Sequence, residues 1–185
     1  MALSSTIHHA TLDLSDVDRD CYRSERLTLA LHPSETPERM VARLLTWCLH
    51  QGDVAEALEF SAGLSTPNEP DLRACSLQDR VTHWIDMGEP DADRVRRACL
   101  RADRVTVVAY GRSWQQWWKR HERDLLKHGR AAVEVLPWDA LVRLADNLPR
   151  SFNWQVTVSD GSLYVVDHRQ QMETLIPERL KERAG

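Results

Sequence analysis

Two acidic residues, Asp71 and Asp86, are the side chains in this sequence whose types and spacing suit chemistry. Asp71 follows Asn68-Glu69-Pro70, and Asp86 lies within Trp84-Ile85-Asp86-Met87-Gly88. Carboxylate oxygens are the ligands that Mg²⁺ and Mn²⁺ prefer, so two such acids at one sheet edge can hold a divalent ion. A nuclease of this design would also carry a lysine two residues after the second acid, to orient the attacking water and offset the charge of the phosphate. That position is Gly88.

The same two acids also have an ordinary structural interpretation. Acidic residues beside proline and glycine often form turns, cap helices or lie on the solvated surface. The spacing of Asp71 and Asp86 therefore supports two hypotheses, a metal site and a pair of structural acids. The strands and helices on which the two acids lie distinguish between these hypotheses.

Length and charge limit the alternatives. A chain of 185 residues fits a single domain, which we place at residues 1–185. The net charge of −4 argues against a protein that coats nucleic acid indiscriminately, so any such contact must be focused on one face. The N-terminus lacks a signal-peptide pattern and no apolar run is long enough to cross a bilayer, which predicts a cytoplasmic protein without a membrane partner.

The first third of the chain has the pattern of a hairpin followed by a helix. Apolar residues alternate with polar ones over residues 7–14 and 26–31, which predicts two antiparallel strands joined by a polar turn. Thr36 and Pro37 suit the N-cap and the first helical position, and the apolar stripe after them predicts a helix that ends at Gly52.

Strands and helices are expected to alternate in the remainder. The near-continuous apolar run over residues 104–110 is typical of a central strand covered on both faces. Asp160-Gly161 favours a tight turn between strands at residues 153–158 and 163–166. We therefore expect a mixed α/β fold, with a central mixed sheet flanked by helices. Further strands are expected within residues 56–64, 72–74, 80–86 and 133–136. One further helix is expected to begin near residue 89, and two others are expected over residues 113–127 and 139–146.

This arrangement brings the acids together. Asp71 is expected at the start of one strand and Asp86 at the end of its antiparallel neighbour, so the two carboxylates can face one another at one end of the sheet. Glu35, just before the first helix, can supply a third carboxylate to the same cluster.

Several longer motifs show a resemblance to a known family. The chain resembles the YaeQ family of bacterial proteins over essentially its full length. The resemblance implies a variant of the PD-(D/E)XK restriction-endonuclease-like nuclease fold with extra antiparallel strands, and it implies no particular reaction. The matching stretches include Leu31-His32-Pro33-Ser34-Glu35-Thr36, Glu38-Arg39-Met40, Glu69-Pro70, Trp84-Ile85, Pro90-Asp91 and Trp117-Trp118.

The resemblance also assigns residues to the motif of that fold. The Pro-Asp element falls on Pro70-Asp71 and the second acid on Asp86, with Glu35, or in second place Glu38, as the acid of the first helix. The lysine position departs from the pattern because it is Gly88. An arginine of the following helix, Arg94 or Arg97, can take its place near a phosphate, but an arginine cannot act as a general base.

Two hypotheses of function follow. The leading one is a nuclease in which Asp71, Asp86 and Glu35 bind Mg²⁺ or Mn²⁺ and Arg94 or Arg97 stabilises the charge that develops on the phosphate. The alternative is a catalytically inactive module of the same fold that binds nucleic acid or a protein partner. The missing lysine and the acidic net charge motivate this alternative.

Overall fold

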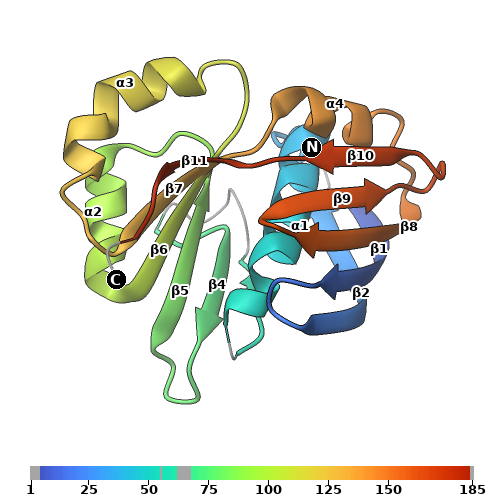
Figure 1. The fold of residues 1–185 in the computed structure, drawn as a ribbon, viewed down its shortest axis with the longest axis horizontal. Coiled ribbons are helices and arrows are strands. Elements are labelled where there is room, and N and C mark those ends of the chain that lie inside the picture. The colour runs from blue at the N-terminus through green and yellow to red at the C-terminus, as the bar shows by residue number, and fades with distance from the viewer. Residues whose placement is uncertain (1–4, 55, 62–67, 184–185) are drawn as a thin grey trace. The chain divides into compact units, whose positions relative to one another are not determined.

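The computed structural model describes residues 5–54, 56–61 and 68–183 (Figure 1). The chain divides into two compact units. The first contains residues 1–53 and 139–176, and the second contains residues 54–138 and 177–185. The single domain expected over residues 1–185 stays a prediction, and each unit is described separately below.

The first unit contains a five-stranded mixed sheet of order β10-β9-β8-β1-β2. β1 pairs antiparallel with β2, as the hairpin pattern predicted, but on its other side it pairs parallel with β8. Asp160 and Gly161 both have positive φ angles in the turn between β8 and β9, which confirms the predicted tight hairpin. The strands are β1 (Thr6–Asp16), β2 (Cys21–Leu31), β8 (Ser151–Ser159), β9 (Ser162–Val166) and β10 (Met172–Leu175).

Helix α1 (Pro37–His50) packs against this sheet, with contacts to β1, β2 and β8. Its start is as predicted, because the Thr36 hydroxyl accepts a hydrogen bond from the Arg39 N–H and Pro37 occupies the first turn. A short 3₁₀ turn (Gln51–Asp53) follows the helix, and a second helix, α4 (Trp138–Ala145), precedes β8.

The second unit contains a six-stranded mixed sheet of order β11-β7-β6-β5-β4-β3. The three consecutive strands β5, β6 and β7 are parallel, whereas β3, β4 and β11 pair antiparallel with their neighbours. The strands are β3 (Glu59–Phe60), β4 (Leu72–Cys75), β5 (Val81–Met87), β6 (Ala102–Ala109), β7 (Ala131–Val135) and β11 (Glu178–Lys181).

Two helices make the crossovers between the parallel strands. Helix α2 (Ala92–Arg101) links β5 to β6, and α3 (Trp114–Leu125) links β6 to β7. Both lie on the same side of the sheet (Figure 1), as right-handed crossovers between strands in consecutive order require. The core of this layer is apolar and includes Trp84, Val95, Ala98, Val105, Val107, Trp117, Leu125 and Val133.

The expected mixed α/β class is confirmed, with two corrections. The structure has two mixed sheets instead of one central sheet, because β1 pairs with β8, about 140 residues further along the chain. The strand expected over residues 56–64 is shorter: β3 covers only Glu59–Phe60, and residues 62–64 lie outside the described residues. The short strands β10 and β11 were not predicted.

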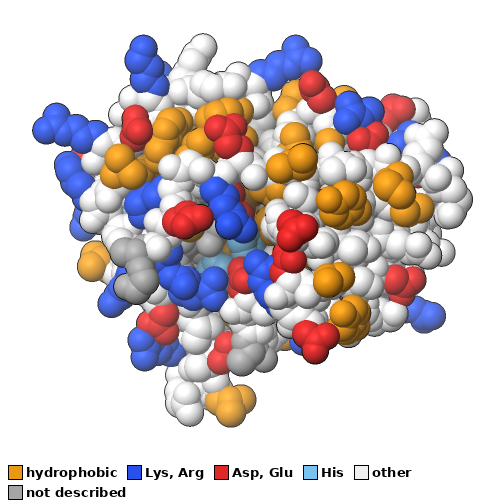
Figure 2. Space-filling view, viewed as in Figure 1, with side chains coloured by type: hydrophobic (Ala, Val, Ile, Leu, Met, Phe, Trp, Pro, Cys, Tyr) orange, Lys and Arg blue, Asp and Glu red, His pale blue; other side chains and the backbone are white. Residues whose placement is uncertain are grey.

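Charged side chains of both signs are intermingled on the face drawn in Figure 2. This distribution fits a chain in which acidic residues only slightly outnumber basic ones. Within the described residues, no helix is both long and apolar enough to cross a membrane.

Candidate functional site

The pairing of β4 with β5 brings Asp71 and Asp86 to the same end of two neighbouring strands. Leu72 lies opposite Ile85 in the antiparallel ladder, and the Asp71 N–H donates to the Ile85 carbonyl at 2.9 Å. Asp71 therefore lies just before β4 and Asp86 close to the end of β5, where their spacing in the sequence predicted them. Both side chains are buried.

Asp86 is held by an arginine from the next helix. Arg94 donates from Nε to Asp86 Oδ2 at 2.9 Å and from Nη2 to Asp86 Oδ1 at 2.7 Å. This is the two-pronged geometry in which a guanidinium binds a carboxylate most strongly. Only 1% of the Asp86 side chain is exposed, so this contact compensates a charge that would otherwise be buried alone.

Asp71 completes the cluster through the backbone. Its Oδ2 accepts a hydrogen bond from the Met87 N–H at 2.7 Å, next to Asp86 in β5. Arg94 also donates from Nη2 to the Glu69 carbonyl at 2.8 Å, two residues before Asp71. The hydrogen bond with Asp86 raises the pKa of Arg94 above its usual value; burial opposes this effect, and the charges of Asp86, Asp71 and Asp91 reinforce it.

The local sequence explains why Arg94 lies over Asp86. Gly88 has a φ of +91° and its N–H donates to the Val108 carbonyl, so the chain turns sharply after β5. Asp91 then caps α2 by accepting from the Arg94 N–H at 2.7 Å. This cap fixes the phase of α2, in which Val95 and Ala98 are buried and Arg94 lies beside Asp86.

The other predicted site residues have different partners. Arg97 forms an exposed ion pair with Asp93 of its own helix at 2.9 Å. Glu35 belongs to the first unit and is buried there, with its carboxylate bound by Arg43 Nε at 2.8 Å and Arg43 Nη2 at 3.0 Å. The structure thus brings Asp71, Asp86 and Arg94 together, whereas Glu35 takes its positive partner within its own unit.

These arrangements bear on the expected metal. Among the described residues, no group of three or more His, Cys, Asp or Glu side chains is placed to hold a metal ion. Both Asp86 oxygens are hydrogen-bonded to Arg94, one Asp71 oxygen to Met87 and both Glu35 oxygens to Arg43. The residues as arranged do not fit a bound Mg²⁺ or Mn²⁺, because a guanidinium already neutralises and contacts both oxygens of Asp86 and of Glu35, where the ion would have to bind.

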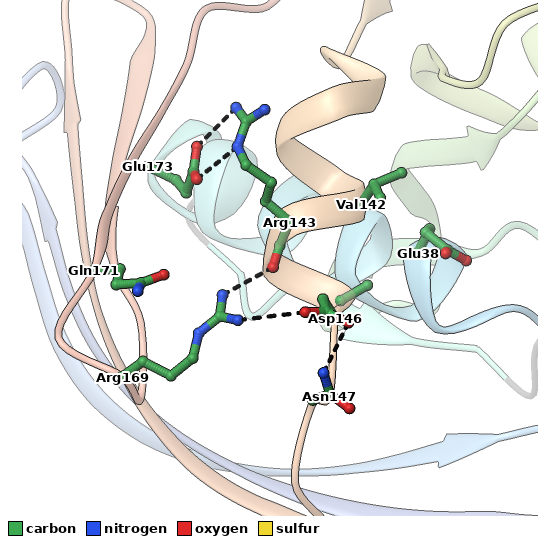
Figure 3. Close-up of a pocket in the computed structure, with 9 residues that line it drawn as sticks. Glu38, Val142, Arg143, Asp146, Asn147, Arg169, Gln171 and Glu173 are labelled. Atoms are coloured by element: carbon green, nitrogen blue, oxygen red, sulfur yellow. Dashed lines mark hydrogen bonds and ion pairs between the residues drawn. The ribbon is translucent and has the colours of Figure 1, made fainter.

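A cavity lies in the first unit, and Glu38, the second choice for the acid of the first helix, is among its lining residues. Its volume is about 450 Å³, and α1, α4 and the segment around β10 line it (Figure 3). Arg143 binds Glu173 through two hydrogen bonds, and Arg169 donates to the Arg143 carbonyl at 2.9 Å and lies near Asp146. Its two arginines are thus already paired with acidic groups of the same unit.

In the part of the chain that the structure describes, two sheets of mixed pairing together with helices α1 to α4 define a mixed α/β protein. The model of the YaeQ protein family matches residues 1–176. The chain therefore belongs to the YaeQ family, as its motifs indicated.

Individual relatives agree with this assignment. The uncharacterized YaeQ protein of Salmonella typhi is 36% identical and that of Escherichia coli K12 is 34% identical, each over 174 residues and 94% of both chains. The crystal structure of YaeQ from Pseudomonas syringae superposes with a TM-score of 0.90 at 36% identity, covering 98% of both chains. That from Xanthomonas axonopodis pv. citri gives 0.89 at 35% identity, covering 98% of this chain and all of the other.

Sequence reasoning singled out Arg94 but did not find its partner. It placed the guanidinium near a phosphate, whereas the structure places it on Asp86. The spacing between Asp91 and Arg94 could have indicated this contact. An aspartate at the N-cap places the residue three positions later next to the cap and fixes the direction of its side chain.

Proposed function

We propose that this YaeQ-family protein binds nucleic acid and does not hydrolyse it through a metal ion. The observation that carries the proposal is the Arg94 contact with both oxygens of Asp86. In a nuclease of the PD-(D/E)XK type, which the motifs resemble, this acid would face a divalent ion. A guanidinium in that place neutralises the acid. Unlike a metal ion, it does not lower the pKa of a bound water molecule.

The exposed surface of the second unit supports nucleic acid as the partner. On α2 the exposed side chains include Arg96, Arg97 and Arg101, and on α3 they include Lys119, Arg120 and Arg123. Binding to phosphate backbones depends mostly on such cations, which displace condensed counterions. Six exposed cations against three exposed acids, Asp93, Glu122 and Asp124, give these two neighbouring helices a locally basic face.

A second candidate is metal-dependent phosphodiester hydrolysis with Mg²⁺ or Mn²⁺. The observation that favours it is the position of Asp71 and Asp86 at the same end of adjacent strands. Hydrolysis by this pair would require Arg94 to leave Asp86, so the two candidates differ in what occupies that carboxylate.

Replacement of Arg94 tests the proposal. In an Arg94→Gln protein, Asp86 keeps a weak donor but loses its buried charge partner, and we expect the free energy of unfolding to fall by about 3 kcal/mol. Mn²⁺ should raise the melting temperature of this variant and leave that of the wild type unchanged, because only in the variant is the Asp86 carboxylate not bound by an arginine.

The same samples decide between the two candidates. The wild type should retain a labelled oligonucleotide in gel-shift assays with Mg²⁺ or Mn²⁺ and leave it uncut. For the stability and Mn²⁺ measurements, Arg96→Gln is the matched control, since Arg96 pairs with exposed Asp93 on the same helix and not with Asp86. Cleavage by the wild type that disappears in Asp86→Ala would establish hydrolysis and refute our proposal.

A further inference from the structure

A small hollow lies along one edge of α2, beside the Arg94–Asp86 contact. Its volume is about 10 Å³, which admits one water-sized group. No Asp or Glu is among the described residues that line it, so every charged side chain in that lining is positive. The lining residues are Asn68, Trp84, Arg94, Arg97, Ala98 and Arg101, all in the second unit.

Three arginines reach this hollow because of their helical spacing. Arg94, Arg97 and Arg101 recur at intervals of three and four residues and therefore form one stripe on α2. Arg94 is committed to Asp86. Arg97 pairs with Asp93 where both side chains are about half exposed, at 51% and 56%, and such pairs contribute little. Among the described residues, Arg101 donates to the Asn68 carbonyl alone, at 3.5 Å. Two guanidinium groups thus remain able to bind an anion.

Trp84 supplies an independent observation. It lies in β5 two residues before Asp86, so both side chains lie on the face of the sheet that α2 covers. Only 6% of Trp84 is exposed, and its indole Nε1 is buried with no hydrogen-bond partner among the described residues. A buried N–H without an acceptor is costly, by about 1 to 3 kcal/mol. Trp84 lines the hollow, so an acceptor that reaches its indole N–H from there would remove this cost.

We propose that the hollow binds one phosphate group. One phosphate oxygen enters it and accepts from Trp84 Nε1, while Arg97 and Arg101 bind the oxygens that stay outside. A phosphate suits these three donors better than a carboxylate does, because it offers more oxygens in a tetrahedral arrangement. The inference rests on the proposed function and locates its phosphate contact. Free phosphate and the phosphodiester of a nucleic acid share this chemistry.

The first experiment measures the affinity for a labelled single-stranded oligonucleotide by fluorescence anisotropy over a range of salt concentrations. We compare Arg97→Gln/Arg101→Gln with Arg96→Gln/Arg123→Gln, which removes the same charge from exposed positions of α2 and α3 that do not line the hollow. The first variant should bind roughly tenfold more weakly or worse. It should also lose about 0.7 from the slope of log K against log salt, since one phosphate contact on a single strand contributes about 0.7.

A second experiment uses inorganic phosphate alone and follows the indole N–H signals by NMR. Phosphate should shift one indole signal of the wild type, and Trp84→Phe should lack that signal and bind phosphate several-fold more weakly while its other signals keep their positions. An unshifted Trp84 signal at saturating oligonucleotide overturns the inference, whatever the affinity.

The outcomes separate this inference from the proposed function. If both double variants lose the same affinity for the oligonucleotide, the phosphate site in the hollow is refuted. The proposed function is not refuted by that result. Binding of inorganic phosphate at Trp84 without any binding of the oligonucleotide supports the hollow as a site for free phosphate and refutes the proposed function. Failure of the wild type to bind either probe refutes both.

Discussion

A carboxylate buried away from water is stable only with a partner, and Asp86 finds one in Arg94. The same solution recurs twice in the first unit. Glu35 is bound by Arg43, and Asp167 is bound by Arg169 through Nε at 2.7 Å. Each pair satisfies both carboxylate oxygens from within one unit, so at the residue scale these acids have structural partners in the folded chain.

Asp167 gives a prediction for the dependence of stability on pH. Burial alone would raise the pKa of this carboxyl, but hydrogen bonds from the Gln171 and Arg169 N–H groups and from the Arg169 side chain outweigh burial and lower it. The unfolded state therefore binds a proton at higher pH than the folded state does. The stability that Asp167 contributes is present above about pH 4, the usual pKa of aspartate, and is lost as the pH falls through the lowered value.

Urea unfolding from pH 7 to pH 3 measures this contribution. Asp167→Asn should lower the free energy of unfolding by roughly 2 kcal/mol at pH 7, because hydrogen bonds to a charged group are replaced by weaker ones. The variant and the wild type should converge in acid. Exposed Asp20→Asn serves as the control and should follow the wild type. A difference between Asp167→Asn and the wild type that persists at pH 3 would contradict the assignment.

At the scale of elements, the turn from β5 into α2 controls the candidate site. Gly88 makes the turn with a φ of +91°, and Asp91 sets where the helix begins. Gly88 occupies the lysine position of the nuclease motif. Glycine is the residue type that adopts a positive φ at little cost. Glycine at this position determines both the missing lysine and the direction of α2.

Substitution of Gly88 tests this role. Gly88→Ala and Gly88→Lys should each lower the free energy of unfolding by about 1 to 2 kcal/mol, since a Cβ disfavours positive φ. Gly88→Lys should also fail to create cleavage activity, because Arg94 still occupies Asp86. Gly129→Ala is the comparison: Gly129 is exposed and its φ is not positive, so little change is expected. Chemical denaturation measures both effects, and an unchanged midpoint for Gly88→Ala would refute the strain argument.

At the scale of the whole molecule, charge is unevenly divided. Acidic residues clearly outnumber basic ones in the first unit, whereas basic residues slightly outnumber acidic ones in the second. The range of electrostatic interactions depends on salt, with a Debye length of about 10 Å at 0.1 M and about 30 Å at 0.01 M. At moderate salt a polyanion therefore senses the local basic face of α2 and α3, and at low salt it also senses the net charge of −4.

This contrast predicts an unusual salt dependence. The affinity for an oligonucleotide should rise as salt is lowered and then level off near roughly 0.02 M, because repulsion by the whole protein begins to offset the local attraction. Anisotropy titrations at several salt concentrations measure the curve. Asp20→Asn/Glu25→Gln, which removes two acids of the first unit, should extend the linear range. A strictly linear plot for the wild type would contradict this prediction.

The local features of the fold are encoded in short stretches of the sequence. Thr36 and Pro37 start α1, Asp160-Gly161 forms the hairpin turn, and the distance from Asp71 to Asp86 spans one antiparallel pair of strands. These features are predictable because they depend on backbone preferences and on side chains a few positions apart.

The pairings between distant segments, in contrast, are visible only in the folded chain. The parallel pairing of β1 with β8 joins distant parts of the chain and creates the second sheet, and no local pattern encodes it. The occupation of Asp86 by Arg94 depends on where the turn at Gly88 directs α2, and the unsatisfied Trp84 N–H depends on how α2 packs over β5. Such contacts follow from the relative placement of packed elements, which fixes whether a buried acid meets a metal ion or an arginine.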